Sequence, residues 1–558
     1  MIAWETSLPD WEDRIVDGRS IVPVQPLFPD VAADALDVFS ALRMVDADGS
    51  PLMGDAVLPW VNELVSALFG SYDPKRKRRL ITNYFLMVSK KNGKSMIAAG
   101  VMLTALILNT RASGEFIILA PTKEAADNAY KPVRDMILAD EELAARFHEQ
   151  KHIKTVTDRL NGATLKVVAA DTATVTGKKA IGVFIDELHE FGKSAKAASM
   201  LTEATGGITS RPEGFIFYCT TQSSEPPAGV FRDKLEYARK VRDGDVVDKR
   251  FLPVIYEFPR HMIAAKAYEI LDNAYITNPN WNVSVDAEVI AQKIQEATEA
   301  GEHALCDIRA KHLNIEVGLN LSSDRWAGSD FWLRQAVPRF TLTDLIARCE
   351  VATVGIDGGG LDDLLGLTVI GREKVTGKWM WWAHAWAHEI VLERRKEIAP
   401  RLLDFQKDGD LTIVALPGQD VDGVADIVCQ LASANMLPVV HAVGVDAAGI
   451  GAIFNELTTR GIKTDQIIAI RQGYTLNGPI KDTERKLAGG EIIHAGSAMM
   501  AWCVGNARIE DKGNAILITK QVSGKSKIDP LMSGFNAISL MSLSPAAPGA
   551  KFQFFSIG

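Results

Sequence analysis

Residues 84–108 place a loop containing glycine and lysine between an apolar run and a run typical of a helix. The apolar run is Tyr84-Phe85-Leu86-Met87, the loop reads Val88-Ser89-Lys90-Lys91-Asn92-Gly93-Lys94-Ser95, and the helical run follows at 96–108. A phosphate-binding loop has this order, because backbone N–H groups and the lysine meet the anion at the helix N-terminus. The stretch therefore predicts a nucleotide site. A glycine-containing turn between a strand and a helix is the alternative.

The triplet Gly-Lys-Ser is not specific by itself, because it occurs three times in this chain. The copy at 192–194 lies several polar residues beyond its nearest apolar strand, and the copy at 524–526 is followed too soon by Pro530 for a helix to start. The copy at 93–95 has a strand before it and a helix after it. Val88 stands where the full G-x-x-x-x-G-K-[ST] pattern has its first glycine, so the match is incomplete.

A second apolar stretch, downstream of the loop, ends in two acids. It reads Ile181-Gly182-Val183-Phe184-Ile185-Asp186-Glu187 and predicts a buried parallel strand. In phosphate-loop enzymes the first acid completes a Mg²⁺ shell with the loop serine, here Ser95, and the second acid orients the attacking water. A strand that simply meets solvent at its carboxyl end is the alternative.

A third apolar stretch, residues 215–219, is followed by Thr220-Thr221-Gln222. These polar groups are candidates for sensing the γ-phosphate and passing on its loss, with a plain turn as the alternative. Further apolar stretches alternate with helical patterns at 80–88, 115–120, 164–169 and 183–185. This alternation predicts an α/β domain with a mostly parallel sheet and helices on both faces.

Length and composition set the number of domains and exclude several classes of protein. At 558 residues the chain is too long for one core, and 47% apolar with 23% charged residues is typical of a globular protein. No run of about 18 apolar residues and no secretory leader is visible, so we expect a cytoplasmic protein without a membrane span. The five cysteines lack paired spacing, which predicts reduced core thiols. A net charge of −9 argues against a chain coated in positive charge to bind nucleic acid.

The residue pattern changes at 317–348, where Gly, Asn, Ser and Trp interrupt the helical periodicity. This change predicts a domain boundary. We expect an N-terminal extension at 1–55, a phosphate-loop ATPase domain at 56–320, a linker at 321–348 and a second α/β domain at 349–558. In the second domain, apolar stretches at 352–356, 367–370 and 379–384 are typical of a strand meander, and a later strand is expected at 439–445.

Three acids of the second domain fall in distant segments that one fold would bring together. Asp357 lies in the first strand, Asp446 ends the later strand, and Asp529 precedes a helical run at 531–541, about where an N-cap would sit. This is the sequence order of a ribonuclease-H-like nuclease. Such a cluster repels itself unless divalent metal, Mg²⁺ or Mn²⁺, occupies it, and two ions activate water for phosphodiester cleavage. Taken singly, each aspartate has a structural alternative: a turn, a loop start or a helix cap.

Together these motifs resemble the large terminase subunit of tailed bacteriophages, over residues 58–543. Residues 90–95, Lys-Lys-Asn-Gly-Lys-Ser, are similar to that family's Walker A motif, and residues 185–189, Ile-Asp-Glu-Leu-His, to its Walker B motif. In the second domain, residues 357–364, with acids at Asp357 and Asp363, resemble the family's Asp-Leu-Ser-x-x-x-Asp-Leu segment. Residues 527–530, Lys-Ile-Asp-Pro, resemble its Lys-Ile-Asp-Pro or Lys-Ile-Asp-Gly.

The resemblance implies an ATPase that translocates double-stranded DNA, with the roles of several residues carried over from the family's motifs. Glu187 would be the catalytic carboxylate of ATP hydrolysis, and Thr220 and Thr221 would couple hydrolysis to movement. Ser95 and Asp186 would hold Mg²⁺. The implied ATP-binding residues are Lys90, Lys91, Asn92, Gly93, Lys94, Ser95 and Asp186.

The resemblance also implies a ribonuclease-H-like nuclease that cuts concatemeric genomes before and after packaging. Asp357, Asp446 and Asp529 would be the catalytic acids that hold the nuclease metals, two Mg²⁺ or Mn²⁺ ions in the family pattern, with Asp363 as a further acid. The implied partners are double-stranded DNA, the small terminase subunit, the portal protein of the procapsid and further copies of the chain in a ring on the portal. The implied location is the cytoplasm of the infected bacterial host, without a membrane and without lasting residence in the virion.

Three departures from the family pattern bear on its chemistry. Val61 stands where the family often has a glutamine that reads adenine, and Lys90 stands where relatives often have an arginine that contacts the γ-phosphate. A lysine supplies a point charge without the planar fork of arginine, so an arginine from a neighbouring subunit becomes a candidate. Gly358 and Gly359 replace Leu-Ser beside the metals, which predicts a looser loop.

Two other functions fit parts of the pattern. A helicase-like ATPase fused to a repair or recombination nuclease would carry both halves but would separate DNA strands. A noncatalytic DNA-binding scaffold would carry decayed sites, and the presence of Lys94, Asp186, Glu187 and the three nuclease acids argues against it.

Overall fold

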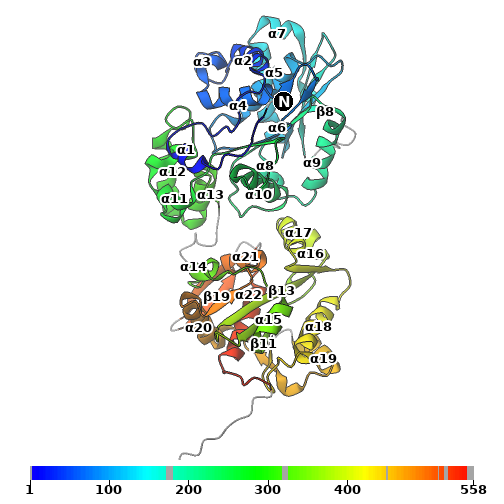
Figure 1. Ribbon diagram of the computed structural model, residues 1–558, viewed down its shortest axis with the longest axis vertical. Coiled ribbons are helices and arrows are strands. Elements are labelled where there is room, and N and C mark those ends of the chain that lie inside the picture. The colour runs from blue at the N-terminus through cyan, green and yellow to red at the C-terminus, as the bar shows by residue number, and fades with distance from the viewer. Residues whose placement is uncertain are drawn as a thin grey trace, which may run out of the picture. The chain divides into compact units, whose positions relative to one another are not determined.

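The computed structural model of the chain divides into two compact units, residues Met1–Val317 and Gly318–Gly558 (Figure 1). The structure describes residues 3–170, 180–316, 325–447, 450–512, 515–520 and 526–548. The predicted boundary between residues 320 and 321, and part of the third Gly-Lys-Ser triplet, lie outside these ranges. The two units are described one after the other.

The first unit is built on a sheet of eight strands among the described residues, in the order β10-β3-β9-β8-β4-β7-β6-β5. All neighbours from β10 to β7 are parallel, and β6 and β5 add an antiparallel hairpin at one edge. A separate hairpin joins β1 (Tyr72–Asp73) to β2 (Arg78–Arg79). The sheet strands are β3 (Asn83–Met87), β4 (Glu115–Ala120), β5 (Phe147–Gln150), β6 (Thr155–Asp158), β7 (Thr164–Ala169), β8 (Ala180–Ile185), β9 (Phe215–Thr220) and β10 (Phe251–Ile255).

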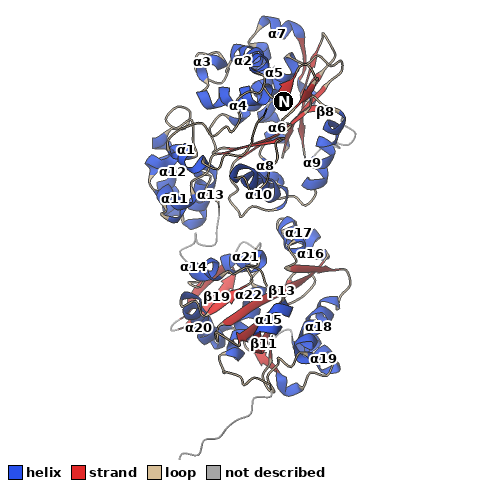
Figure 2. Ribbon diagram, viewed as in Figure 1, coloured by secondary structure: helices blue, strands red, loops and turns tan. Residues whose placement is uncertain are grey.

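Helices cover both faces of this sheet, and alternate strand residues supply the two cores (Figure 2). Tyr84 and Leu86 of β3 point to one core, and Phe85 and Met87 point to the other. The helices of this unit are α1 (Trp11–Val16), α2 (Pro29–Ala41), α3 (Met53–Ala56), α4 (Pro59–Phe69), α5 (Lys94–Ile107), α6 (Lys123–Leu138), α7 (Glu141–Arg146), α8 (Leu188–Phe191), α9 (Ala197–Gly206), α10 (Gly229–Asp243), α11 (Arg260–Ala264), α12 (Ala287–Ala300) and α13 (Glu302–Leu313).

The predicted N-terminal extension at 1–55 packs into the core of the first unit. Trp11 and Phe39 are buried there, and a Cβ placed on Gly100 of α5 would lie 2.6 Å from the Phe39 ring. The small glycine therefore lets α5, which follows the phosphate loop, approach α2 closely. The N-terminal helices form part of the support of the loop.

The second unit is built on a mixed sheet with the order β14-β13-β12-β11-β15-β16, and β17 also pairs with β13. Strands β11, β12 and β13 form the expected antiparallel meander, and β15 lies parallel to β11. Strands β18 and β19 form a separate hairpin. The strands are β11 (Cys349–Gly358), β12 (Leu364–Glu373), β13 (Trp379–His388), β14 (Leu411–Val414), β15 (Val443–Asp446), β16 (Ile467–Ile470), β17 (Ile492–His494), β18 (Ala507–Lys512) and β19 (Ala515–Lys520).

Helix α22 crosses one face of this sheet at very short range. A Cβ placed on Gly355 of β11 would lie 1.9 Å from the Ser533 carbonyl oxygen, so only glycine permits this approach. The opposite face is covered by α15, α18 and α19, whose apolar residues belong to a second core. The helices are α14 (Ser329–Trp332), α15 (Leu342–Arg348), α16 (Ile390–Arg394), α17 (Ala399–Lys407), α18 (Gln419–Ser433), α19 (Ile450–Thr459), α20 (Asn477–Ala488), α21 (Ala498–Asn506) and α22 (Asp529–Met541).

Both units have the predicted α/β class, and three local expectations differ from the structure. The described part of the predicted linker, 325–348, belongs to the second unit and buries Trp326 and Trp332 completely, because these indoles pack in its core. The strand expected at 439–445 begins only at Val443, and Val439 is 73% exposed. Asp529 is the first residue of α22 instead of its cap.

All five cysteines lie among the described residues, outside any disulfide, and four of them are buried. Among the helices that the structure describes, none combines the length and apolar character needed to cross a membrane.

Candidate nucleotide and nuclease sites

The phosphate loop joins β3 to α5 at the carboxyl edge of the parallel sheet. Helix α5 begins at Lys94, and Gly93 immediately before it has φ +78°. Lys91 also has a positive φ, of +75°. This backbone leads directly into a helix N-terminus, where unpaired N–H groups and the helix dipole favour an anion. The structure therefore has the strand–loop–helix geometry that the sequence predicts.

The ammonium of Lys94 lies inside the loop. Its Nζ donates hydrogen bonds to the carbonyl oxygens of Val88 (3.2 Å) and Ser89 (3.1 Å), and the residue is 7% exposed. Burial lowers the pKa of Lys94, while the charges of Glu187 and Asp186 act in the opposite direction. The lysine thus stands close enough to both predicted acids to sense their charge. In contrast, Lys90, Lys91 and Ser95 are exposed.

The side chain of Asn92 fixes the loop to a distant segment of the first unit. Its Nδ2 donates to Asn278 Oδ1 (2.8 Å) and to the Ser89 carbonyl (3.1 Å), and its Oδ1 accepts from the Asn280 N–H (3.0 Å). The Lys90 N–H donates to the Lys311 carbonyl (2.8 Å). Asn92 is completely buried, so its side chain supports the loop from behind.

Asp186 and Glu187 follow the carboxyl end of β8, beside the loop strand's neighbour β9. Burial, together with the charge of Glu187, raises the pKa of Asp186 to about 6. Glu187 has φ +54°, and its N–H donates to Asp186 Oδ1 (3.0 Å). A non-glycine residue in this conformation is strained, and such strain persists where the surroundings impose it. The two carboxylates are thereby held in different environments, one buried and one partly open to solvent.

Thr220 and Thr221 lie at the carboxyl end of β9, next to the loop. The Val88 N–H donates to the Thr220 carbonyl oxygen (3.1 Å), which connects the start of the loop with this strand end. Thr220 is completely buried and Thr221 is 2% exposed. Both hydroxyl groups also contact His189, a residue without a role in the sequence-based prediction. The loop, the two acids and the threonines therefore adjoin along one edge of the sheet.

The predicted nuclease acids meet at one edge of the second sheet. Strands β11 and β15 are parallel with Ile356 opposite Val445, so Asp357 and Asp446 follow at the same level. Burial raises the pKa of Asp357 well above its usual range, and the charges of Asp529, Asp446 and Asp363 add to this effect. Four acids from separate segments therefore crowd one place.

Side-chain donors bind two of these acids. Gln472 Nε2 donates to Asp357 Oδ1 (2.7 Å), and the buried ammonium of Lys527 lies 2.5 Å from Asp363 Oδ1. Burial would raise the pKa of Asp363, but its hydrogen bond to Lys527 and the lysine charge outweigh burial and lower it. Burial and the neighbouring Asp363 raise the pKa of Asp529. Negative charge is thus distributed unevenly over the cluster: it is favoured on Asp363 and disfavoured on Asp357 and Asp529.

The donor chemistry at this edge fits a hard divalent cation, whereas the side-chain arrangement does not yet present a coordination shell. Carboxylate oxygens are the preferred ligands of Mg²⁺ and Mn²⁺, and a cation would relieve the repulsion that raises the pKa of Asp357. Among the residues that the structure describes, no group of three or more His, Cys, Asp or Glu is arranged to hold a metal ion. In the structure, Oδ1 of Asp357 and Oδ1 of Asp363 are instead hydrogen-bonded to Gln472 and Lys527.

Gly358 gives the cluster its close spacing. Its φ is +85°, and a Cβ on this residue would lie 2.3 Å from the Leu364 carbonyl oxygen and 2.9 Å from the Asp529 Cβ. The looser loop expected from Gly358 and Gly359 stays a prediction, and the structure adds that the absent side chain of Gly358 makes room for Asp529. Gly360 has φ +122° but faces open space.

Sequence reasoning gave no role to Gln472, Lys527, His189 or Asn278, although each contacts a predicted site residue. Lys527 and His189 stand within the motifs that carried the resemblance, which was the available signal. Gln472 and Asn278 are separated from their partners by 115 and 186 positions, and no local pattern reveals such pairs. Val61, at the expected place of an adenine-reading glutamine, is buried in α4 and belongs to the core.

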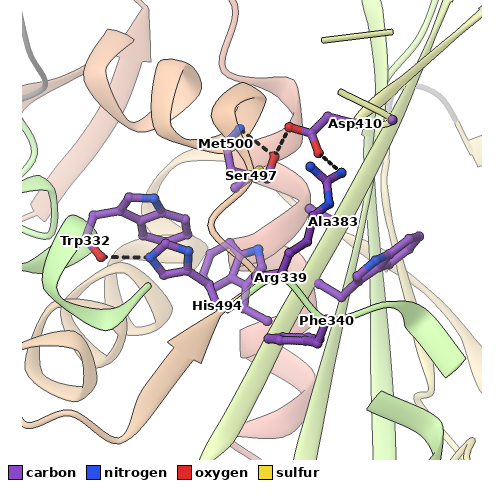
Figure 3. A pocket seen from close by; sticks show the side chains of 12 residues that line it. Trp332, Arg339, Phe340, Ala383, Asp410, His494, Ser497 and Met500 are labelled. Carbon is purple, nitrogen blue, oxygen red and sulfur yellow. Dashed lines mark hydrogen bonds and ion pairs between the residues drawn. The ribbon is translucent and has the colours of Figure 1, made fainter. Parts of the chain in front are cut away.

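A small enclosed pocket lies elsewhere in the second unit (Figure 3). Its volume of about 30 Å³ is enough for roughly one water molecule. Asp410 pairs there with Arg339 (2.6 Å) and accepts from the Ser497 hydroxyl (2.7 Å), as Figure 3 shows. The lining residue Ala383 lies opposite Thr368, whereas the strand end beside the acids is at Leu364. This pocket is therefore separate from the acid cluster.

Comparison with known proteins identifies two matching family models. The model described as "Terminase large subunit, ATPase domain" matches residues 59–240, and the one described as "Terminase large subunit, endonuclease domain" matches residues 260–544. The second match begins within the first compact unit.

Individual relatives are distant in sequence. The chain is 23% identical over 476 residues to the terminase large subunit of Lactococcus phage p2, which covers 81% of each chain. It is 23% identical over 331 residues to protein YmfN of Escherichia coli strain K12, covering 58% of this chain and 68% of that protein. Among solved structures, the large terminase of bacteriophage HK97 aligns with a TM-score of 0.46 at 15% identity, covering 91% of this chain and 99% of that one.

Proposed function

The chain belongs to the terminase large subunit family, and we propose that it drives double-stranded DNA into a procapsid by ATP hydrolysis and cuts concatemeric DNA with its second unit. It carries an ATPase domain and an endonuclease domain, which are the parts of a DNA-packaging motor. The division between residues 317 and 318 supports one ATPase domain before it, in which the proposed core at 56–320 packs together with the segment at 1–55, and one nuclease domain after it, which includes 349–558. Residues 325–348 then belong with the nuclease.

The observation that supports two activities best is the presence of one charge centre in each unit. In the first, Lys94 lies near enough to Asp186 and Glu187 to feel their charges. In the second, Asp357 lies among three further acids. Perturbed groups of this kind are concentrated at functional sites, because catalysis requires charges that a merely stable fold avoids. Two such centres on separate sheets favour two separate reactions.

In the ATPase unit, the loop residues Lys90, Lys91, Gly93 and Lys94 would bind the phosphates of ATP through N–H groups and ammonium charges. Asn92 would keep the loop in shape through its bonds to Asn278 and Asn280. Ser95 and Asp186 would hold Mg²⁺, which neutralises phosphate charge when it is bound. Glu187 would orient the attacking water and accept its proton. Thr220 and Thr221 would transmit the loss of the γ-phosphate to the rest of the unit.

In the nuclease unit, Asp357, Asp446 and Asp529, with Asp363, would hold Mg²⁺ or Mn²⁺. Two such ions supply an activated water and stabilise the leaving oxygen of a phosphodiester. Lys527 would keep Asp363 in place, and Gln472 would hold Asp357 until metal binds.

The proposed partners follow from family membership. They are double-stranded DNA, the small terminase subunit, the portal of the procapsid and further copies of this chain in a ring. The proposed setting is the cytoplasm of the infected bacterial host.

A single preparation tests this proposal. Purified full-length protein is incubated with a long linear duplex and Mg²⁺ or Mn²⁺, with and without ATP, and both phosphate release and DNA length are followed. We expect metal-dependent cleavage and ATP turnover without strand separation in a parallel assay of a labelled duplex. ATP-dependent strand separation would favour the helicase-like alternative, and absence of both activities would favour a noncatalytic scaffold.

A further inference from the structure

His189 connects the predicted catalytic carboxylate with the end of strand β9. Its ring Nε2 lies 3.5 Å from Glu187 Oε2, and its ring Nδ1 lies 3.2 Å from Thr220 Oγ1 and 3.5 Å from Thr221 Oγ1. The residue is 6% exposed, and the edge of its ring packs against Phe231, with centroids 6.3 Å apart. The imidazole is thus fixed between two segments that carry residues of the proposed ATPase site.

The hydrogen-bonding capacity of the ring fits this bridging position. Nε2 faces carboxylates of Glu187 and Glu190, and ionised carboxylates only accept hydrogen bonds, so Nε2 carries the proton. In the neutral ring Nδ1 then accepts, and the Thr221 hydroxyl, 3.5 Å away, is the available donor, because the Thr220 hydroxyl donates its hydrogen to the Thr221 carbonyl oxygen (2.8 Å). Both nitrogens are therefore used, one on each side.

A backbone contact strengthens the same connection. The His189 N–H donates to Thr220 Oγ1 over 3.1 Å, so a single hydroxyl contacts both the main chain and the ring of His189. The turn that carries Glu187, with its strained φ of +54°, is consequently attached to β9 just after the acid. Strand β9 in turn accepts the Val88 N–H at the start of the phosphate loop. Movement of this strand end would therefore reach Glu187 through His189.

On the basis of the proposed ATPase activity, we propose that His189 is a positioning residue: it holds the Glu187 carboxylate in register with Thr220 and Thr221 during ATP hydrolysis. It does not contact the phosphates in this role and acts through Glu187. A merely structural histidine would stabilise the turn without selectively affecting turnover. The two roles differ in which kinetic constant changes.

The test uses the full-length protein and measures steady-state ATP turnover, binding of a fluorescent ATP analogue and the melting temperature. For His189→Ala we expect a fall in kcat of about 10- to 100-fold, because misplacing a catalytic group by about 1 Å costs up to about 100-fold. The KM for ATP and the affinity for the analogue should stay within about twofold, since Lys94 and the loop are intact. Glu190→Gln is the matched control. It removes the other carboxylate at the same ring nitrogen, 3.3 Å away, and should keep kcat within about twofold.

A double-variant cycle with Glu187→Gln decides whether His189 acts through the glutamate. Residual phosphate release is followed over hours for Glu187→Gln alone and together with His189→Ala. If His189 positions Glu187, the second substitution reduces the residual rate by less than about twofold. The proposal would be overturned if the rate reductions of the two substitutions multiply in the double variant. It would also be overturned if His189→Ala raises the KM and leaves kcat unchanged. If His189→Ala does not fold, the same measurements are made on His189→Gln. A glutamine amide can replace the ring's contact with either Glu187 or the threonines, but not both. Wild-type protein without ATP turnover would contradict the proposed function itself.

Discussion

The side-chain amide of Gln472 donates a hydrogen bond of 2.7 Å to Oδ1 of Asp357, an acid of the proposed nuclease site. Gln472 follows β16, two strands away from the β11 strand that carries Asp357. A neutral donor therefore satisfies a buried carboxylate whose other neighbours are acids. Gln472 at Asp357 and Lys527 at Asp363 together explain how the fold tolerates this cluster of acids without a metal ion.

Asp357→Asn should make the metal-free protein more stable and abolish nuclease activity. Asparagine keeps an oxygen that accepts from Gln472 but removes one charge from the repelling cluster, so we expect about 1–2 kcal/mol of added stability at pH 7.5 in EDTA. Denaturant unfolding measures this change. Mg²⁺ should then stabilise the wild type and have less effect on the variant. Destabilisation of the variant in EDTA would show that charge repulsion at Asp357 costs less than its carboxylate contributes through hydrogen bonding.

Gly358→Ala should inactivate the nuclease through crowding, and Gly360→Ala separates crowding from backbone strain. Both residues have positive φ, but only a Cβ on Gly358 meets the Asp529 Cβ and the Leu364 carbonyl. We expect Gly358→Ala to lose about 2–4 kcal/mol of stability together with DNA cleavage, and Gly360→Ala to lose about 1–2 kcal/mol and retain cleavage. Plasmid nicking and unfolding curves measure the two effects. Equal loss of cleavage in both variants would contradict the crowding explanation.

Asp186→Asn should change how the stability of the nucleotide-free protein depends on pH. The folded pKa of Asp186 is about 6 and its usual value is 3.8, so the folded state binds this proton more tightly than the unfolded chain does. Stability from this group is therefore present below about pH 4 and is lost as pH rises to about 6. At pH 7.5 the neutral variant should be more stable by about 1–3 kcal/mol, and near pH 4 the difference should disappear. Urea unfolding at the two pH values checks this, and a pH-independent difference would contradict it.

Asn92→Asp should destabilise the phosphate loop by removing hydrogen bonds that support it. Aspartate still accepts from the Asn280 N–H, but it cannot donate to Asn278 Oδ1 or to the Ser89 carbonyl, which would then face a buried carboxylate. We expect a loss of about 2–4 kcal/mol in unfolding free energy and weaker ATP-analogue binding. Asn282→Asp, an exposed asparagine in the same supporting segment, should stay within about 0.5 kcal/mol. Similar losses for the two variants would argue against a specific role for Asn92.

The parallel core of the first unit could be predicted from sequence because its strands are nearly continuous apolar runs. Expected stretches at 115–120 and 164–169 coincide with β4 and β7, and the run at 181–185 lies within β8. The edge hairpin of β5 and β6 was not predicted, since Glu149 and Gln150 are polar and only partly buried, so β5 lacks the continuous apolar run of the central strands. In the second unit, Val439 and Val440 read as strand but are exposed, because apolar character alone does not place a residue in a sheet.

Candidate site residues at the ends of strands could be predicted from the sequence. Residues distant in the sequence that hold them by hydrogen bonds could not. Lys94 and Asp186 each follow a strand of one parallel sheet, so topology alone brings them to a common edge. Their supports, Asn278 and His189, depend on how loops fold back, which the local pattern does not encode. The space that Gly358 leaves for Asp529 could not be predicted for the same reason, since Asp529 comes from a helix distant in the sequence.

The most direct test of two separate activities is a reciprocal pair of variants assayed for ATP turnover and DNA cleavage in the same preparations. Lys94→Ala should lose ATP turnover and keep metal-dependent cleavage, whereas Asp357→Asn should lose cleavage and keep ATP turnover. Circular dichroism and melting curves establish that both variants are folded. Loss of both activities in either folded variant would contradict the assignment of ATP hydrolysis to the first unit and DNA cleavage to the second.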